Sequence, residues 1–352
     1  MSASSDPGAA DARGSRRVTI VDVAKHAGVS VASASKVVRN AYGASSAMRE
    51  RVMASVESLG YRPHRLAQGL RGPTKTIGVL VSDIENPFFD LLLAGAGEVF
   101  AESEHEMFLA LAGTSGLEHA AATESLIDHR MDGLILVAPR GTPASLERFG
   151  REIPTVVVGR HGPAEAYDTV SGDDATGLRL VVEHLAALGH RHISFLENES
   201  DANESLPENV RLAAYRAALR DLSLGPPDSF RVPWTAEGGR SAARILLERR
   251  ELPTAVFTGA DIVALGLLSE LWDHGVAVPG ELSVVGYDDS PTAQLRPIGL
   301  TSVNQSGQLM GRLAAHLLLE RIAGRTVAQH ELLLPELRPR TTSGPVRGGS
   351  AR

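Results

Sequence analysis

The chain has 352 residues, which suggests two or three domains, and a formal net charge of -7 at pH 7. It contains no cysteine, so disulfides, thiolate chemistry and cysteine-based zinc sites are excluded. No stretch of 18 apolar residues occurs, and the first 17 residues lack the apolar segment of a signal peptide, so we expect a cytoplasmic protein without a membrane span.

The charge is distributed unevenly along the chain. Residues 16–75 hold eleven Lys or Arg and three Asp or Glu, a net of +8, whereas the remainder holds twenty-four against thirty-nine, a net of -15. A basic segment joined to an acidic body is typical of a protein that binds nucleic-acid phosphates with one end. Residues 1–16 and 343–352 are rich in small residues and Arg, and we expect both to be disordered tails.

The basic segment shows three short helical patterns. Thr19 can cap a first helix with Asp22 three residues later, and Gly28 permits a tight turn. Ser30 then caps a second helix with small or basic residues on its outer face. A third helix, about Ser46 to Leu59, covers the first two. This arrangement predicts a helix-turn-helix.

Four motifs at fixed spacing carry a resemblance to a known family. D-V-A-K-H-A-G-V-S (22–30), R-E-R-V (49–52), L-G-Y-R-P (59–63) and L-A-Q-G-L-R (66–71) resemble the headpiece and hinge of the LacI/GalR family of bacterial transcription regulators. The resemblance implies a DNA-binding headpiece over 17–62 and a hinge over 63–75 that becomes helical on operator DNA. A small helical bundle and a plain linker are the alternatives.

The resemblance also implies which residues contact operator DNA. Residues of the second helix would meet base edges, the flanking residues would meet phosphate, and Leu70 would wedge into the minor groove. Lys36 stands where Arg is usual, so it keeps the charge but loses the bidentate contact to guanine. The expected DNA-binding residues are Thr19, Val31, Ala32, Ser33, Ser35, Lys36, Arg39, Arg49, Tyr61, His64, Arg65 and Leu70.

From Thr76 onward, short apolar strands alternate with amphipathic helices. Strands are expected at 77–81, 107–111, 133–137, 155–158, 193–196, 255–258 and 283–287, and helices at 88–101, 118–129, 209–222, 239–249 and 261–274. This rhythm predicts an α/β core of two doubly wound parallel-sheet lobes, which bind ligands beyond the carboxyl ends of their strands.

This body is similar to the periplasmic-binding-protein-like core of the same family. D-I-E-N-P-F-F (83–89), M-D-G-L-I-L (131–136) and S-V-V-G-Y-D-D (283–289) are among the matching motifs, and the similarity covers residues 76–342. It implies an N-lobe of about 76–174 plus 304–334 and a C-lobe of about 175–303 plus 335–342. A small-molecule effector, usually a sugar, sugar phosphate or nucleobase, would bind between them.

Several residues carry chemistry suited to that cleft. Arg211 can direct two donors at one ligand, and Trp234 can stack on the apolar face of a ring. The expected effector-binding residues are Asp83, Asn86, Phe88, Phe89, Arg160, Arg211, Trp234, Asp261, Asp288 and Gln305. Ordinary core packing is the alternative for Phe88 and Phe89, a surface salt bridge for Arg211 and a helix cap for Asp288.

Two departures from the family pattern concern the ligand. Ala260 stands where members often carry Asn, and Gly159, followed by Arg160, stands where many have an acidic residue. Both changes remove acceptors for hydroxyl groups, and Arg160 adds a donor. An anionic or less hydroxylated ligand therefore remains open beside a sugar.

The sequence shows few features that are typical of an enzyme. The G-x-G within 93–100 lacks the third glycine and falls in a helix, and His184, His190 and His192 have poor metal geometry. We expect no enzyme activity, metal or cofactor. The sequence predicts a homodimeric regulator, by family resemblance a repressor, whose affinity for double-stranded operator DNA is switched by a small-molecule effector. A periplasmic-type binding protein and, remotely, a nucleotide-dependent enzyme are the alternatives.

Overall fold

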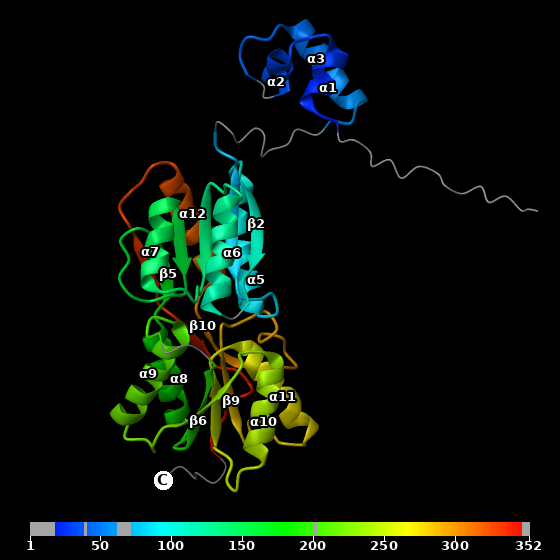
Figure 1. Ribbon diagram of the computed structural model, residues 1–352. Helices are drawn as coiled ribbons and strands as arrows, with labels where there is room; N and C mark the ends of the chain where they lie inside the picture. The colour runs from blue at the N-terminus through cyan, green and yellow to red at the C-terminus, as the bar shows by residue number, and fades with distance from the viewer. Residues whose placement is uncertain (1–17, 39–40, 62–71, 114, 200–202, 347–352) are drawn as a thin grey trace, which may run out of the picture. The chain divides into compact units, whose positions relative to one another are not determined.

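The computed structural model describes residues 18–38, 41–61, 72–113, 115–199 and 203–346. The chain divides into two compact units, Met1–Thr74 and Lys75–Arg352, and each is described here by itself (Figure 1). The predicted tail 1–16 and most of the predicted hinge lie outside the described residues.

The first unit contains α1 (Ile20–Ala27), α2 (Val31–Val38) and α3 (Ser46–Ser58). The predicted capping box is confirmed, because the Thr19 backbone N–H donates to Asp22 Oδ2 at 2.8 Å and the Asp22 N–H donates to Thr19 Oγ1 at 3.4 Å. Gly28 has a φ of 67°, as the tight turn requires. The Ser33 N–H donates to Ser30 Oγ at 3.1 Å, so Ser30 caps α2 as predicted.

A small apolar core holds these three helices together. Val23 and Ala34 are fully buried, Val37 is nearly so, and Val52 reaches them from α3. The outer face of α2 is therefore left free of core packing, which is the arrangement of a helix-turn-helix.

The second unit contains two six-stranded sheets that form two lobes (Figure 1). The N-lobe sheet has the order β11-β5-β4-β3-β1-β2, and the C-lobe sheet has the order β12-β10-β9-β8-β6-β7. Every pair in these orders is parallel except the antiparallel pair β10 and β12. The predicted α/β fold class is confirmed.

The bounds of the elements follow the chain. The strands are β1 (Thr76–Val81), β2 (Glu106–Leu111), β3 (Gly133–Val137), β4 (Thr155–Val158), β5 (Asp168–Gly172), β6 (Ile193–Asn198), β7 (Asp228–Val232), β8 (Ala255–Thr258), β9 (Ser283–Tyr287), β10 (Thr301–Asn304), β11 (His330–Leu333) and β12 (Glu336–Arg338). The helices are α5 (Pro87–Glu102), α6 (Gly116–Asp128), α7 (Pro143–Glu152), α8 (Asp174–Ala187), α9 (Pro207–Asp221), α10 (Ala236–Leu247), α11 (Asp261–Asp273) and α12 (Gly307–Ile322).

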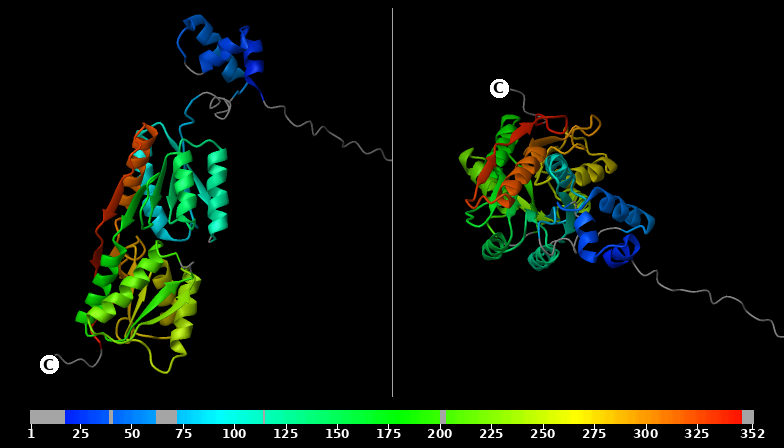
Figure 2. Two further views of the ribbon diagram at one scale, coloured as in Figure 1. Left: turned by 60° about the vertical axis from the view of Figure 1, so that its left-hand side comes forward. Right: turned by 90° about the horizontal axis from the view of Figure 1, so that it is seen from above.

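The chain passes between the lobes three times. It leaves the N-lobe sheet after β5, returns after β10 to form α12 and β11, and leaves again into β12. Figure 2 shows the last of these passages as the red strands that run from one lobe to the other. Helix α12 packs closely on α5, because a Cβ on Gly311 would lie 2.0 Å from the Leu92 carbonyl oxygen. The carboxyl ends of both sheets therefore meet around the crossing segments.

The end of the described chain differs from the prediction. Residues 343–346, which we expected in a disordered tail, pack on the C-lobe: the Val346 N–H donates to the Leu188 carbonyl at 3.2 Å, and the Gly344 carbonyl lies 3.0 Å from His190 Nε2. The tail prediction is therefore wrong for these four residues, whereas 347–352 lie outside the described part of the chain. Among the described residues, no helix is long and apolar enough to cross a bilayer.

Candidate functional site

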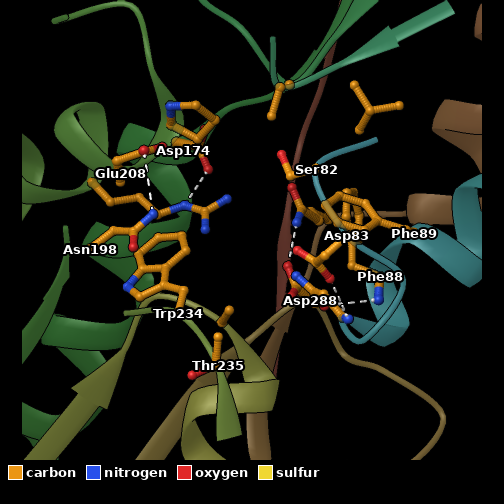
Figure 3. Close-up of a pocket in the computed structure, with 18 of the residues that line it drawn as sticks. Ser82, Asp83, Phe88, Phe89, Asp174, Asn198, Glu208, Trp234, Thr235 and Asp288 are labelled. Atoms are coloured by element: carbon orange, nitrogen blue, oxygen red, sulfur yellow. Dashed lines mark hydrogen bonds and ion pairs between the residues drawn. The ribbon is translucent and has the colours of Figure 1, made fainter. Parts of the chain in front are cut away.

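A cavity of about 390 Å³ lies where the carboxyl ends of the two sheets face each other. Side chains after β1, including Ser82 and Asp83, lie on one side, and Asn198, Glu208 and Trp234 lie on the opposite side (Figure 3). Its size falls in the range of about 300–1,000 Å³ that is usual for small-molecule sites. Its position is the one expected for a ligand site in open α/β sheets.

Eight of the ten residues predicted for this cleft line the cavity. They are Asp83, Asn86, Phe88, Phe89, Arg211, Trp234, Asp288 and Gln305. The other two, Arg160 and Asp261, do not belong to the lining.

The segment after β1 is shaped by its own polar side chains. Asp83 Oδ1 accepts from the backbone N–H groups of Glu85 and Asn86 at 2.9 and 3.0 Å, and Asn86 Oδ1 caps α5 by accepting from the Phe88 N–H at 3.1 Å. These bonds bring Phe88 and Phe89 to the cavity wall, where their ring centroids lie 6.1 Å apart. Both rings also belong to the N-lobe core, so the packing role and the cavity role coincide.

Arg211 is buried and held on three sides. Its Nε donates to Asp174 Oδ1 at 2.8 Å, its Nη1 donates to the Gly259 carbonyl at 2.6 Å, and its guanidinium lies 3.7 Å from the centre of the Tyr287 ring. The side chain is 5 % exposed, so the alternative of a surface salt bridge is wrong. Arg211 also lies 5.5 Å from the Trp234 ring, which brings the arginine and a stacking surface together at the cavity.

Asp174 is the buried anion that pairs with Arg211. It also accepts from the Tyr287 hydroxyl at 2.9 Å and lies 2.7 Å from His161 Nε2. Burial opposes its ionisation, but the Arg211 guanidinium and the His161 hydrogen bond outweigh burial and hold the pKa of Asp174 below its usual value. The positive charge of Arg211 is therefore balanced by Asp174 within the wall of the cavity.

Asp288 ends β9 with an acceptor that has no partner. Its Oδ1 accepts from Gln305 Nε2 at 2.6 Å, while its buried Oδ2 has no hydrogen-bond partner in the described part of the chain. Burial, with the nearby Asp261 carboxyl, raises the pKa of Asp288 well above its usual value. Turns rather than a helix follow Asp288, so the helix-cap alternative fails. A buried acceptor in a cavity wall suits a ligand hydroxyl.

Arg160 and Asp261 have different surroundings from those predicted. Arg160 turns back into the N-lobe, where its Nη1 donates to the carbonyls of Pro139 and Gly141, each at 2.6 Å. Asp261 is fully buried and accepts from Ser302 Oγ at 2.6 Å and from the Ser290 N–H at 2.7 Å. Burial raises the pKa of Asp261 to about 7. Arg160 is not among the residues that line the cavity, and its buried Nη2 has no hydrogen-bond partner among the described residues, so its contact with a ligand stays a prediction.

The sequence reading missed several polar residues of the lining, namely Ser82, Arg140, Asp174, Asn198, Glu199, Glu208 and Thr235. Among them, Arg140 Nη2 lies 3.4 Å from Glu208 Oε1. Asp174 and Glu208 stand in the first turns of α8 and α9, where acidic residues are common for reasons of helix stability. Their sequence signal is therefore the ordinary signal of a helix start, which conceals their place in the cavity.

Histidines near the C-lobe serve the protein's own structure. His184 Nε2 lies 2.9 Å from Ser343 Oγ, His190 Nε2 lies 3.0 Å from the Gly344 carbonyl, and His192 Nε2 lies 3.1 Å from Asp228 Oδ2. Among the described residues, no group of three or more His, Asp or Glu is placed to hold a metal ion.

In the first unit, the residues predicted to read bases lie on the outer face of α2. Val31, Ala32 and Lys36 are exposed, and Ser33 and Ser35 are partly exposed. Thr19 and Arg49 lie at or near the exposed starts of α1 and α3, whereas Tyr61 packs partly against the apolar core. The remaining predictions, Arg39, His64, Arg65 and Leu70, lie outside the described residues.

Comparisons with known proteins cover both units. Residues 19–64 match the model of bacterial regulatory proteins of the lacI family, and residues 182–343 match a periplasmic binding protein-like domain. The chain is 33% identical to the ribose operon repressor of Escherichia coli (strain K12) over 323 residues, which cover 90% of this chain and 96% of the repressor. It is also 33% identical to the HTH-type transcriptional regulator CelR of Thermobifida fusca, over 91% of this chain and 96% of CelR.

Solved structures agree with these matches. A lac repressor dimer bound to operator and the anti-inducer ONPF is 27% identical, with a TM-score of 0.76 and coverage of 94% of this chain and 100% of that chain. A complex of transcriptional regulator CelR with cellobiose is 32% identical, with a TM-score of 0.68 and coverage of 93% and 100%.

Proposed function

The chain belongs to the LacI family of bacterial transcription regulators, and we propose that a neutral hydroxylated molecule in the inter-lobe cavity sets its affinity for operator DNA. The protein is a sequence-specific DNA-binding regulator that works as a homodimer. The match over residues 19–64 removes the alternative of a transport binding protein without a DNA role.

The charge of the cavity lining carries the proposal about the effector. Five carboxyl side chains line it against two guanidinium groups, and the two arginines are paired with Asp174 and Glu208. Even without Asp288, whose pKa is raised, acidic side chains outnumber the arginines. An anion would meet excess negative charge there, so the lining disfavours the anionic ligand that the sequence left open.

Hydroxyl groups, by contrast, find suitable partners. The unpartnered Asp288 Oδ2 can accept from a ligand hydroxyl, and Trp234 and Phe88 offer flat apolar surfaces for the face of a sugar ring. The ribose operon repressor and the CelR complex with cellobiose are relatives whose names point to neutral sugars. We propose a ligand of the same chemical class for this chain.

We propose that α2 reads the major groove. Its exposed face carries Ala32 and Lys36. Ala32 is small enough to let the helix approach base edges, and Lys36 can reach base edges and phosphates with its positive charge. A dimer would place two such helices on half-sites about one helical turn apart. Thr19 and Arg49 suit phosphate contacts beside them.

We propose that β2 contributes to the contact between subunits. It is an edge strand of the N-lobe sheet, and its Phe108, Leu109 and Leu111 side chains are 45%, 46% and 55% exposed. An exposed apolar edge strand is a liability in a monomer, whereas a second copy of the chain would cover it.

The assigned relatives are regulators rather than enzymes, and we propose that the protein acts by binding alone, in the cytoplasm where its DNA target lies. A direct test is a gel shift with the DNA that flanks the coding region, with and without ribose, cellobiose, a neutral hexose and a sugar phosphate. We expect binding in the absence of ligand or with one neutral sugar, and a change of at least about tenfold in affinity when that sugar is added or removed. Regulation by the sugar phosphate alone would refute the proposed ligand class.

A further inference from the structure

Arg140 and Glu208 join the two lobes directly across the cavity. Arg140 follows β3 of the N-lobe, Glu208 lies in the first turn of α9 of the C-lobe, and Arg140 Nη2 lies 3.4 Å from Glu208 Oε1. Their side chains are only 13% and 8% exposed, so water screens the pair weakly.

The N-lobe holds Arg140 in place through its backbone. The Arg140 N–H donates to His119 Nδ1 at 3.4 Å, and His119 is itself buried with its Nε2 3.1 Å from the Gly113 carbonyl. On both sides of Arg140, the carbonyls of Pro139 and Gly141 accept from Arg160 Nη1. Arg160 therefore helps to fix the turn that presents Arg140.

Two features of the C-lobe hold Glu208 in place. Pro207 begins α9, and Glu208 follows it at a helix N-terminus, where a carboxylate is favoured by the helix dipole. Asn198 Nδ2, at the end of β6, lies 3.4 Å from the same Glu208 oxygen. Because each partner is fixed to its own lobe, a change in the angle between the lobes must change the Arg140–Glu208 distance.

His161 makes two further contacts between the lobes. The His161 N–H, in the N-lobe loop between β4 and β5, donates to the Ser205 carbonyl of the C-lobe at 2.9 Å. His161 Nε2 lies 2.7 Å from Asp174 Oδ2, at the start of α8. Among the described residues that line the cavity, Arg140 and Glu208 form the arginine–carboxylate pair that joins the two lobes.

We propose that Arg140 and Glu208 are positioning residues for lobe closure, and that their ion pair holds the two lobes together around the cavity. Removing either partner leaves the other as an unpaired, nearly buried charge, which the protein can relieve by opening the cleft to water. The consequence for effector affinity rests on the proposed function, whereas the consequence for the lobe angle does not.

The absence of cysteine from the chain allows a direct measurement. Asp128 on α6 and Asp221 on α9 are exposed and lie in different lobes, so the full-length Asp128→Cys/Asp221→Cys protein can carry two spin labels. Double electron–electron resonance then gives the distance between the lobes without DNA or effector. The test adds Arg140→Gln, Glu208→Gln and the exchange Arg140→Glu/Glu208→Arg to this background.

A matched control is Arg148→Gln, which removes an Arg–Glu pair that lies wholly within the N-lobe, with Arg148 Nη2 2.7 Å from Glu124 Oε1. We expect Arg140→Gln and Glu208→Gln each to raise the population at longer distances at least about fivefold, and Arg148→Gln to leave the distribution unchanged. The exchange should restore the short distance in part, since an arginine in the first turn of α9 is opposed by the helix dipole.

Circular dichroism of each variant checks that it is folded. If a single variant does not fold, the exchange and Arg140→Lys, which keeps the charge, still test the pair. Distance distributions that coincide for the wild type, Arg140→Gln and Glu208→Gln would overturn the proposal. So would equal opening in the single variants and in the exchange, because the contact would then act through packing rather than charge. Either result would leave the proposed regulator function standing.

Discussion

Gln305 Nε2 donates to Asp288 Oδ1 at 2.6 Å, so the end of β9 is tied to the segment that crosses back into the N-lobe. This bond fixes the Asp288 carboxyl and leaves its second oxygen, Oδ2, buried without a partner in the described residues. Under the proposed function, a ligand hydroxyl would donate to this oxygen, on the same carboxyl that holds Gln305. The pair would then link ligand binding to the connection between the lobes.

Asp288→Asn is expected to weaken effector binding by at least about tenfold, because the amide replaces an acceptor with a donor at nearly the same size. Isothermal titration with the sugar that changes DNA binding measures the effect. Asp90→Asn, an exposed change on α5, is the control and should bind as the wild type does. Unchanged affinity in Asp288→Asn would remove Asp288 from the ligand contacts.

The buried Asp261 gives stability a pH dependence of defined sign. Its pKa is raised to about 7 by burial, above its value in an unfolded chain, so the native state keeps a proton between about pH 4 and pH 7 that the unfolded state has released. The free energy of unfolding should therefore fall as the pH rises through this window. The contribution is at most about 4 kcal/mol, from a difference of about three pKa units.

Asp261→Asn should remove this part of the pH dependence. Urea unfolding at pH 5 and pH 8 can follow tryptophan fluorescence, since both tryptophans, Trp234 and Trp272, lie in the C-lobe. Asp273→Asn changes an exposed carboxyl on the same helix and serves as the comparison. If the wild type and Asp261→Asn lost equal stability between the two pH values, Asp261 would not be the titrating group.

Local sequence signals predicted much of the fold, and the misses have physical causes. The Thr19–Asp22 capping box depends on residues three apart, so the sequence shows it directly. Strand β5 was missed because its sequence, D-T-V-S-G, has no apolar run. It is buried nonetheless, because it lies between β4 and β11 in the sheet and its Asp168 is paired with Arg321 and Arg325. A strand whose buried residues are mostly polar carries little hydrophobic signal.

The cavity was predicted where a polar residue follows a strand, as Asp83 and Asp288 do. Side-chain direction was harder to foresee: Arg160 also follows a strand but turns back to the carbonyls of Pro139 and Gly141. The Arg140–Glu208 contact joins segments that are far apart in sequence and lie in different lobes, so it could not be predicted from the sequence.

Gly259→Ala is expected to displace the Trp234 ring. A Cβ at position 259 would lie 1.8 Å from an edge carbon of that ring, so the ring must move out of its place in the cavity wall. We expect a loss of about 1–3 kcal/mol in stability, a changed tryptophan emission spectrum and weaker effector binding. Gly97→Ala, in α5 with no atom within 4 Å of the added Cβ, should instead stabilise the protein by up to about 1 kcal/mol. A Gly259→Ala protein with native emission and affinity would contradict the assigned role of Trp234.

Leu111→Glu should weaken the dimer if β2 lies between subunits. A buried, unpaired carboxylate at such a contact is costly, so the dimer dissociation constant should rise at least about tenfold. Analytical ultracentrifugation over a range of concentrations measures it. Leu222→Glu alters another exposed leucine, at the end of α9, and should leave the dimer intact. A dimer of equal strength in both variants would place the subunit contact elsewhere.

Lys36 and Lys25 offer a test of base reading by α2. Both side chains are exposed, but Lys36 lies on the outer face of α2, whereas Lys25 lies in the last turn of α1. Lys36→Ala should weaken binding to the regulated promoter fragment by about 1–3 kcal/mol and binding to random duplex by less, because a base contact adds to the general attraction for phosphate. Lys25→Ala should reduce both affinities by similar, smaller factors.

Fluorescence anisotropy at several salt concentrations separates the two effects, since the loss of a phosphate contact lowers the salt dependence while the loss of a base contact does not. Equal losses on both DNAs for Lys36→Ala would assign Lys36 to phosphate and leave sequence recognition to its neighbours on α2.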